Sequence, residues 1–239
     1  MAIWRSVPFI AAALVLAPVG VIVSAFFAPA SDVWQHLLET TLPQLLINTF
    51  WLALGVVSGT ALLGISLAWL TAVYDFTGRR FFSWALLLPM AMPAYVTAFV
   101  ALGLFDFTGP VQTMLRAWLD SDLSWFPDIR GRAGVIVVMT LAFYPYVYLL
   151  ARNAFLSQGK RSLEVAQSLG FNRKQGFFKV VLPMARPWIA GGVMLVLMET
   201  LADFGTVAVF NYNTFTTAIY KAWFSMFSLP AASQLASLL

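Results

Sequence analysis

Long apolar runs alternate with short polar stretches along the 239 residues of the chain. A helix needs about 20 consecutive apolar residues to cross a hydrocarbon layer of ~30 Å. We therefore predict membrane-spanning helices near residues 7–28, 44–73, 81–104, 134–156 and 186–210. The final residues, AASQLASLL, have the pattern of the start of a sixth span. The pattern predicts an all-α membrane protein with one domain, residues 1–239, containing five full spans and the beginning of another.

Composition agrees with this interpretation. The chain is 61% hydrophobic and only 10% charged, whereas about a quarter of the residues of a soluble domain are charged. The first apolar run is also longer than the roughly 7–15 residues of a signal-peptide core, so we expect it to remain as a span. The sequence contains no cysteine, which excludes disulfides and thiolate chemistry.

The distribution of basic residues indicates an orientation. If the N-terminus is cytoplasmic, ten of the 14 basic residues fall on the cytoplasmic side, as the positive-inside rule requires. These ten are Arg5, Arg79, Arg80, Arg152, Lys160, Arg161, Arg173, Lys174, Lys179 and Arg186. The rule therefore predicts a cytoplasmic N-terminus and places the polar loop 157–185 in the cytoplasm.

This loop, SQGKRSLEVAQSLGFNRKQGFFKVVLPMA, has the features of a short helix followed by a turn. Ser162 is expected to cap the helix, and Glu164 would then lie near its positive N-terminal end. Gly170 would provide the left-handed residue that ends it. One side of this helix would be apolar, formed by Leu163, Ala166 and Leu169.

A second helix is expected after the glycine. Asn172 and Gln175 have the spacing of a capping box, and Pro183 would end the helix before the next span. Three basic side chains would be exposed on it: Arg173, Lys174 and Lys179. The loop is thus predicted to be two short helices that together offer a compact surface for docking.

The second span contains small residues and a false phosphate-loop pattern. Gly55 and Gly59 have the spacing that lets helices approach closely. The stretch GTALLGIS has Ile65 where a phosphate loop requires lysine, and it lies in an apolar helix. The chain is therefore expected not to be an enzyme, and any ATP hydrolysis would belong to a partner.

The third span contains two prolines four residues apart, in LLLPMAMPAYVTAF. Pro89 and Pro93 each remove a backbone hydrogen bond from a helix. One interpretation is a static kink that aids packing. The other is a flexible point beside a transport pathway, in which Tyr95 would also lie.

The fifth span contains two carboxylates in METLADFG. Glu199 and Asp203 are four residues apart, so they would share one helix face. A charge at membrane depth costs at least ~2.5 kcal/mol, so such groups normally face protein or water. They could line or gate a polar route for a cation, or they could hydrogen-bond to neighbouring helices or to backbone near the outer interface and so fix the bundle.

The residues do not predict a resident metal site. Tyr144, Tyr146 and Tyr148 lie together in the fourth span, but tyrosines in a span usually pack or lie at the interface. His36, the only histidine, is expected to be a surface residue. No bound cofactor is expected either.

The loop 157–185 resembles the coupling loop of bacterial ABC importer permeases, whose signature is E-A-A, three residues, G, nine residues and I-x-L-P. Val165 replaces the first alanine and Val180 replaces the isoleucine of that signature. The positions that agree are Glu164, Ala166, Gly170, Leu182 and Pro183. The segments ETLADFGTVAVF, TFTTAIYKAWFSM and LLLPMAMPAYVTAF are similar to the ferric-iron subgroup.

The resemblance implies a type I ABC importer-like helical bundle in the bacterial cytoplasmic (inner) membrane. The implied partners are two cytoplasmic ATPase subunits that use ATP and Mg, a periplasmic solute-binding protein and a second permease half. In the ferric subgroup the halves are commonly fused, so this chain would be the first half. Related permeases carry thiamine, sulfate, molybdate or polyamines. The alternative function is an ion-coupled secondary transporter that uses Glu199 and Asp203.

Overall fold

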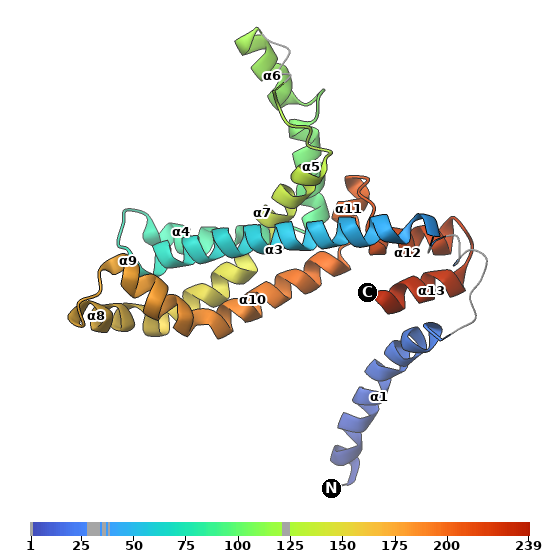
Figure 1. The fold of residues 1–239 in the computed structure, drawn as a ribbon, viewed down its shortest axis with the longest axis horizontal. Coiled ribbons are helices and arrows are strands. Elements are labelled where there is room, and N and C mark those ends of the chain that lie inside the picture. Colours follow the sequence, from blue (N-terminus) through green and yellow to red (C-terminus); the bar gives the residue numbers. More distant parts are fainter. Residues whose placement is uncertain (1, 28–33, 35–36, 38, 121–124) are drawn as a thin grey trace. The chain divides into compact units, whose positions relative to one another are not determined.

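The computed structural model describes residues 2–27, 34, 37, 39–120 and 125–239. Every regular element among these residues is a helix (Figure 1). His36 lies outside the described residues. Five helical stretches of the described chain are long and apolar enough to cross a membrane: Val7–Ala25, Leu42–Val73, Ala94–Leu119, Arg132–Ser168 and Arg173–Ala202. The all-α class and the number of spans are confirmed, although the third stretch is not the one predicted.

The chain divides into two compact units, the first of which joins Met1–Thr49 to Asn213–Leu239. Its apolar core includes Leu45, Phe215 and Leu235, which are buried. Its helices are α1 (Ala2–Ala25), the beginning of α3 (Leu42–Val73), α12 (Phe215–Phe224) and α13 (Leu229–Leu238). The single domain over residues 1–239 and the sixth span remain predictions.

The second unit, Phe50–Tyr212, contains the rest of α3 and the other helices that the structure describes. Two of its elements, η2 and η3, are π-helical turns, and η1 is a 3-10 helix. The elements are α4 (Arg79–Ala85), η1 (Leu88–Ala91), α5 (Ala94–Phe105), α6 (Pro110–Leu119), α7 (Arg132–Ala154), η2 (Phe155–Gly159), α8 (Lys160–Ser168), α9 (Arg173–Gly176), η3 (Phe177–Val181), α10 (Leu182–Ala202) and α11 (Gly205–Val209).

Helix α7 forms the core of this unit, and α10 runs beside it (Figure 1). Glycines allow both α10 and α3 to approach α7 closely. A methyl group on Gly192 of α10 would lie 2.9 Å from Cα of Val147. On α3, methyl groups on Gly55 and Gly59 would lie 2.6 Å and 2.7 Å from α7 side-chain atoms. The predicted close approach at this glycine pair is confirmed.

The prediction of one continuous span over 81–104 is wrong. The chain forms α4, turns through η1 and starts again at α5. Pro89 lies in η1, and Pro93 precedes α5 with φ −57° and ψ 139°, which is not helical. Two prolines four residues apart remove two helical hydrogen bonds from one short stretch, so the helix breaks instead of bending.

Two tyrosines of α7 form hydrogen bonds with the backbone next to this break. Tyr144 donates its hydroxyl hydrogen to the carbonyl oxygen of Leu86 at 2.9 Å, and Tyr148 donates to that of Ser83 at 3.1 Å. Both carbonyls lie at the end of α4, where a helix leaves its last carbonyl groups unpaired. These phenols therefore pair the backbone that the proline break exposes, which supports the static interpretation of Pro89 and Pro93.

Candidate functional site

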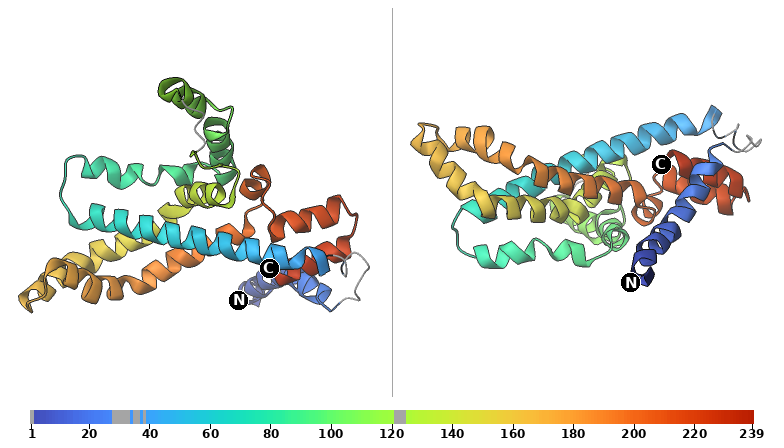
Figure 2. Two further views of the ribbon diagram at one scale, coloured as in Figure 1. Left: turned by 45° about the horizontal axis from the view of Figure 1, so that its top comes forward. Right: turned by 90° about the horizontal axis from the view of Figure 1, so that it is seen from below.

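Helices α8 and α9 fold back on each other as a hairpin, residues 160–176, at one end of α7 and α10 (Figure 2). Gly170 forms the turn with φ +89°, a conformation that costs glycine little. Its amide donates to the carbonyl of Gln167 at 3.0 Å, and the Phe171 amide donates to that of Ala166 at 3.1 Å. These bonds satisfy the last carbonyls of α8, as expected for a glycine that ends a helix. The predicted left-handed turn at Gly170 is confirmed.

The second limb of the hairpin begins with the predicted capping box. The Gln175 amide donates to Oδ1 of Asn172 at 2.8 Å, and the Asn172 amide donates to Oε1 of Gln175 at 3.1 Å. The helix does not end at Pro183, however, because α9 continues through η3 into α10. Pro183 lies in the first turn of α10, directly after a π-helical turn whose pairing already departs from the α-helical pattern.

The first limb of the hairpin, α8, is also continuous with a span, which was not predicted. Ser162 does not cap a helix, because α8 follows α7 through η2 without interruption. The residue before α8, Gly159, has helical angles of φ −62° and ψ −46°. Glu164 consequently lies inside a long helical segment, not near a free N-terminus. Each limb of the hairpin is thus an extension of a span, joined to it by a π-helical turn.

Packing inside the hairpin depends on a glycine that the sequence analysis missed. A methyl group on Gly176 would lie 2.8 Å from Cδ1 of Leu163 and 3.3 Å from Cβ of Ala166. Leu163 and Ala166 are buried as predicted, but Leu169 is 73% exposed because α8 ends at Ser168. A glycine within an expected helix, opposite an apolar face, was the available signal for Gly176.

The residues of the coupling signature separate into two groups. Those at the free surface of the hairpin are Glu164, Val165 and Gly170. Those that pack within the hairpin or at its base are Ala166, Val180, Leu182 and Pro183. Glu164 shares a shallow polar hollow with Lys160 and Arg161. The first group can contact a partner protein, whereas the second holds the hairpin in place.

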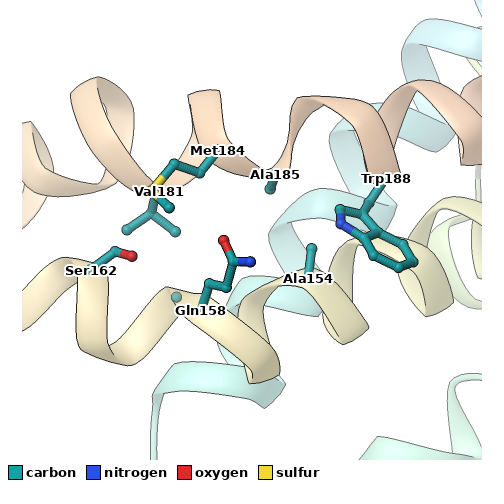
Figure 3. Close-up of a pocket in the computed structure, with 8 residues that line it drawn as sticks. Ala154, Gln158, Ser162, Val181, Met184, Ala185 and Trp188 are labelled. Atoms are coloured by element: carbon teal, nitrogen blue, oxygen red, sulfur yellow. The ribbon is translucent and has the colours of Figure 1, made fainter.

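A small pocket lies at the base of the hairpin, between η2 and α8 on one side and η3 and α10 on the other (Figure 3). Its polar groups are the amide of Gln158 and the hydroxyl of Ser162. Val181, Met184 and Trp188 form much of the opposite wall (Figure 3). The pocket therefore combines two polar side chains with an apolar wall, and it lies between the π-helical turns η2 and η3.

The prediction that Glu199 and Asp203 share a helix face is wrong, because α10 ends at Ala202. The carboxylate of Asp203 instead caps the short helix α11. It accepts hydrogen bonds from the Thr206 amide at 2.9 Å, the Thr206 hydroxyl at 3.0 Å and the Val207 amide at 3.2 Å. Glu199 remains in α10, on an exposed face. Asp203 is thus engaged in local structure, which supports a fixing role for it.

Among the residues proposed for a pathway, Tyr95 lies against Gly205, two residues after Asp203. A methyl group on Gly205 would lie 2.8 Å from Cβ of Tyr95, so the start of α5 packs against α11. Pro93 positions this start. Within the described part of the chain, three or more His, Cys, Asp or Glu residues do not gather into a possible metal site.

Comparison with known proteins identifies a family. Residues 61–238 match the family described as "Binding-protein-dependent transport system inner membrane component". The Fe(3+)-transport system permease protein FbpB 2 of Haemophilus influenzae is 32% identical over 206 residues, which are 86% of this chain and 36% of that protein. Two sulfate transport system permease proteins of Escherichia coli are also similar. CysT is 29% identical over 74% of this chain and 63% of its own length, and CysW is 30% identical over 84% and 67%.

The chain thus spans about a third of the iron permease and less than two thirds of CysT. The family match covers most of the chain, including the hairpin and α7–α11. The chain belongs to the family of binding-protein-dependent transport system inner-membrane components and is a multi-pass inner-membrane protein.

Proposed function

We propose that this chain is a permease part of an ATP-driven, binding-protein-dependent importer, and that the hairpin is the docking site of its ATPase. The observation that carries this proposal is the exposure of Glu164 and Val165 beside the left-handed turn at Gly170. Family membership supports it. The false phosphate loop lies inside α3, and in the proposed importer a partner would hydrolyse ATP. The hairpin is continuous with α7 and α10 through η2 and η3, so these are the helices on which its displacement would act first.

The proposed assembly contains two cytoplasmic ATPase subunits that use ATP and Mg, a periplasmic solute-binding protein and a second permease half. We propose ferric iron as the substrate, because an iron permease is similar over 86% of this chain. Sulfate is the second candidate, because CysT and CysW have nearly the same identity. The binding protein would select the substrate. Uptake of radiolabelled ferric iron and of sulfate, measured side by side in the same cells, distinguishes the two.

Two substitutions that change the charge of the hairpin test the docking site. We expect Glu164→Lys and Gly170→Asp to abolish uptake and capture of the ATPase, while insertion into the membrane stays normal. Glu39→Lys is the matched control for Glu164→Lys, since it makes the same change at an exposed glutamate outside the hairpin. Co-purification of the ATPase and uptake into cells are the measurements.

Two outcomes would contradict the proposal. Normal ATPase capture by both hairpin variants would remove the hairpin as the docking site. Uptake that persists in them and depends on the proton gradient would favour the alternative, an ion-coupled secondary transporter. That alternative lacks support at Asp203, whose carboxylate is already bound by the backbone and side chain of α11.

A further inference from the structure

Three aromatic rings from distant parts of the chain meet at the base of the hairpin. Trp69 belongs to α3, Phe155 is the first residue of η2, and Phe177 is the first residue of η3. The centroid of the Trp69 ring lies 5.4 Å from that of Phe155 and 4.4 Å from that of Phe177. The Phe155 and Phe177 centroids are 6.2 Å apart. Each ring therefore contacts the other two, at separations typical of aromatic pairs.

A second contact joins α3 to the same limb of the hairpin. The guanidinium carbon of Arg173 lies 4.4 Å from the centroid of the Tyr74 ring, a cation–π geometry. Tyr74 follows α3 directly and its ring lies 6.4 Å from that of Trp69. Arg173 and Phe177 are one helical turn apart. The end of α3 and the residue that follows it therefore contact this limb at two successive turns.

The positions of the two phenylalanines matter because they open the two π-helical turns. A π-helical turn interrupts the regular pairing of a helix, so each limb is joined to its span at an irregular turn. The two turns also lie against each other, since a methyl group on Gly159 would be 3.6 Å from Cγ1 of Val181. Displacement of the hairpin could therefore be absorbed at these turns unless something fixes them. Trp69 packs on both.

We propose that Trp69, Phe155 and Phe177 form an aromatic joint that passes displacement of the hairpin to α3. This inference rests on the proposed function and adds a third helix to the two, α7 and α10, that are covalently continuous with the hairpin. The joint acts through packed side chains, which carry coupling when they hold two elements in a fixed relation. Its members are positioning residues, and they act in transport without contacting substrate or nucleotide.

Substitution of Trp69 tests the joint in the assembled transporter. Trp69→Leu keeps an apolar side chain but removes the ring that bridges the two turns. We expect it to capture the ATPase and hydrolyse ATP as the unaltered protein does, while uptake per ATP hydrolysed falls by about tenfold, within the range of reported coupling effects. Trp69→Phe should restore most of the coupling. Trp51→Leu is the matched control, because Trp51 is an exposed tryptophan near the opposite end of α3. Uptake per ATP that is unchanged by Trp69→Leu would overturn the proposal.

A distance measurement between α3 and α8 tests the joint even if Trp69→Leu fails to assemble. The chain has no cysteine, so spin labels can be attached at Leu62→Cys on α3 and Gln167→Cys on α8, both exposed positions. If the joint is rigid, their distance stays the same when the transporter binds ATP. A distance that changes on ATP binding would overturn the proposal. If the unaltered transporter fails to capture an ATPase at all, the proposed function fails first, which separates the two failures.

Discussion

The hairpin and the far end of α10 both contain residues that the sequence marked as functional, but the structure uses them differently. At the hairpin, Glu164 and Val165 lie at the surface, and the backbone bonds around Gly170 serve only to hold that surface in shape. At the end of α10, the carboxylate of Asp203 is bound by three donors of the next helix.

The difference separates two reasons for a polar residue in a membrane protein. A polar side chain that is exposed on an ordered turn is available to a partner, whereas one that pairs backbone groups at a helix break is needed for the fold itself. The same division applies to tyrosines, since Tyr144 and Tyr148 pair the carbonyls that the break after α4 leaves free.

The largest effect on stability is expected in the helix that links these two regions. A methyl group at Gly192 would meet Cα of Val147 at 2.9 Å and the carbonyl oxygen of Tyr146 at 3.3 Å, and backbone cannot move aside easily. We expect Gly192→Ala to lower the free energy of unfolding by about 1–3 kcal/mol through overpacking. Thermal unfolding in detergent is the measurement.

The neighbouring glycine gives the control. A methyl group at Gly191 would lie 3.8 Å from Cδ1 of Leu150, which is ordinary contact. Gly191→Ala should therefore be neutral or raise stability by up to about 1 kcal/mol, as alanine favours helix. Equal melting temperatures for the two variants would show that α7 and α10 do not depend on this close approach.

The next effect is expected at Asp203. Asp203→Ala removes the acceptor for three hydrogen bonds and should lower stability by about 0.5–2 kcal/mol, as for loss of a helix cap. Asp203→Asn keeps an acceptor oxygen and should retain most of the stability. Because Asp203 serves the fold, uptake compared at equal amounts of folded protein is expected to be unchanged in both variants.

Loss of uptake without loss of stability at Asp203 would contradict the distinction between exposed and structural polar residues. If Asp203→Asn abolishes uptake while the melting temperature is unchanged, the charge itself acts in transport. Glu199→Gln extends the test, because Glu199 is exposed on α10 and caps nothing in the part of the chain that the structure describes. Loss of uptake in this variant alone would place the transport role at Glu199.

The most local change in stability is expected at Gly170, because it affects the hairpin alone. A methyl group there would meet nothing within 4 Å, so any effect must come from the positive φ of the backbone. Gly170→Ala should weaken the hairpin by about 1–2 kcal/mol, and Gly170→Asn by less, because asparagine adopts this conformation more readily. Hydrogen exchange of residues 160–176 measures the change. Faster exchange is expected for Ala than for Asn, and equal exchange in both variants and the unaltered protein would contradict it.

Features that depend on local sequence could be predicted. The apolar runs predicted four of the five candidate spans, Gly170 predicted the turn, and the spacing of Asn172 and Gln175 predicted the capping box. Each of these follows from a few neighbouring residues and their backbone preferences. The family resemblance followed from the same stretch.

Features that depend on packing could not be predicted in this way. The continuity of α8 with α7 overrides the capping preference of Ser162, and the break of the third span needs donors from α7 to be tolerable. The close contacts at Gly176 and Gly192 exist only when two helices meet. Hydrogen bonding of Asp203 to backbone was one of the two alternatives, but its place at the start of a new helix was not predicted, because its partners three and four residues later were expected to belong to the same span.

The most direct test of the hairpin's role uses the absence of cysteine from the chain. Val165 is 59% exposed on α8, and Trp118 is 81% exposed on α6. A cross-linker attached at Val165→Cys should capture the partner ATPase in membranes, and one attached at Trp118→Cys should not. Absence of a cross-link from Val165→Cys, or equal capture from both positions, would contradict the assignment of the hairpin as the docking site.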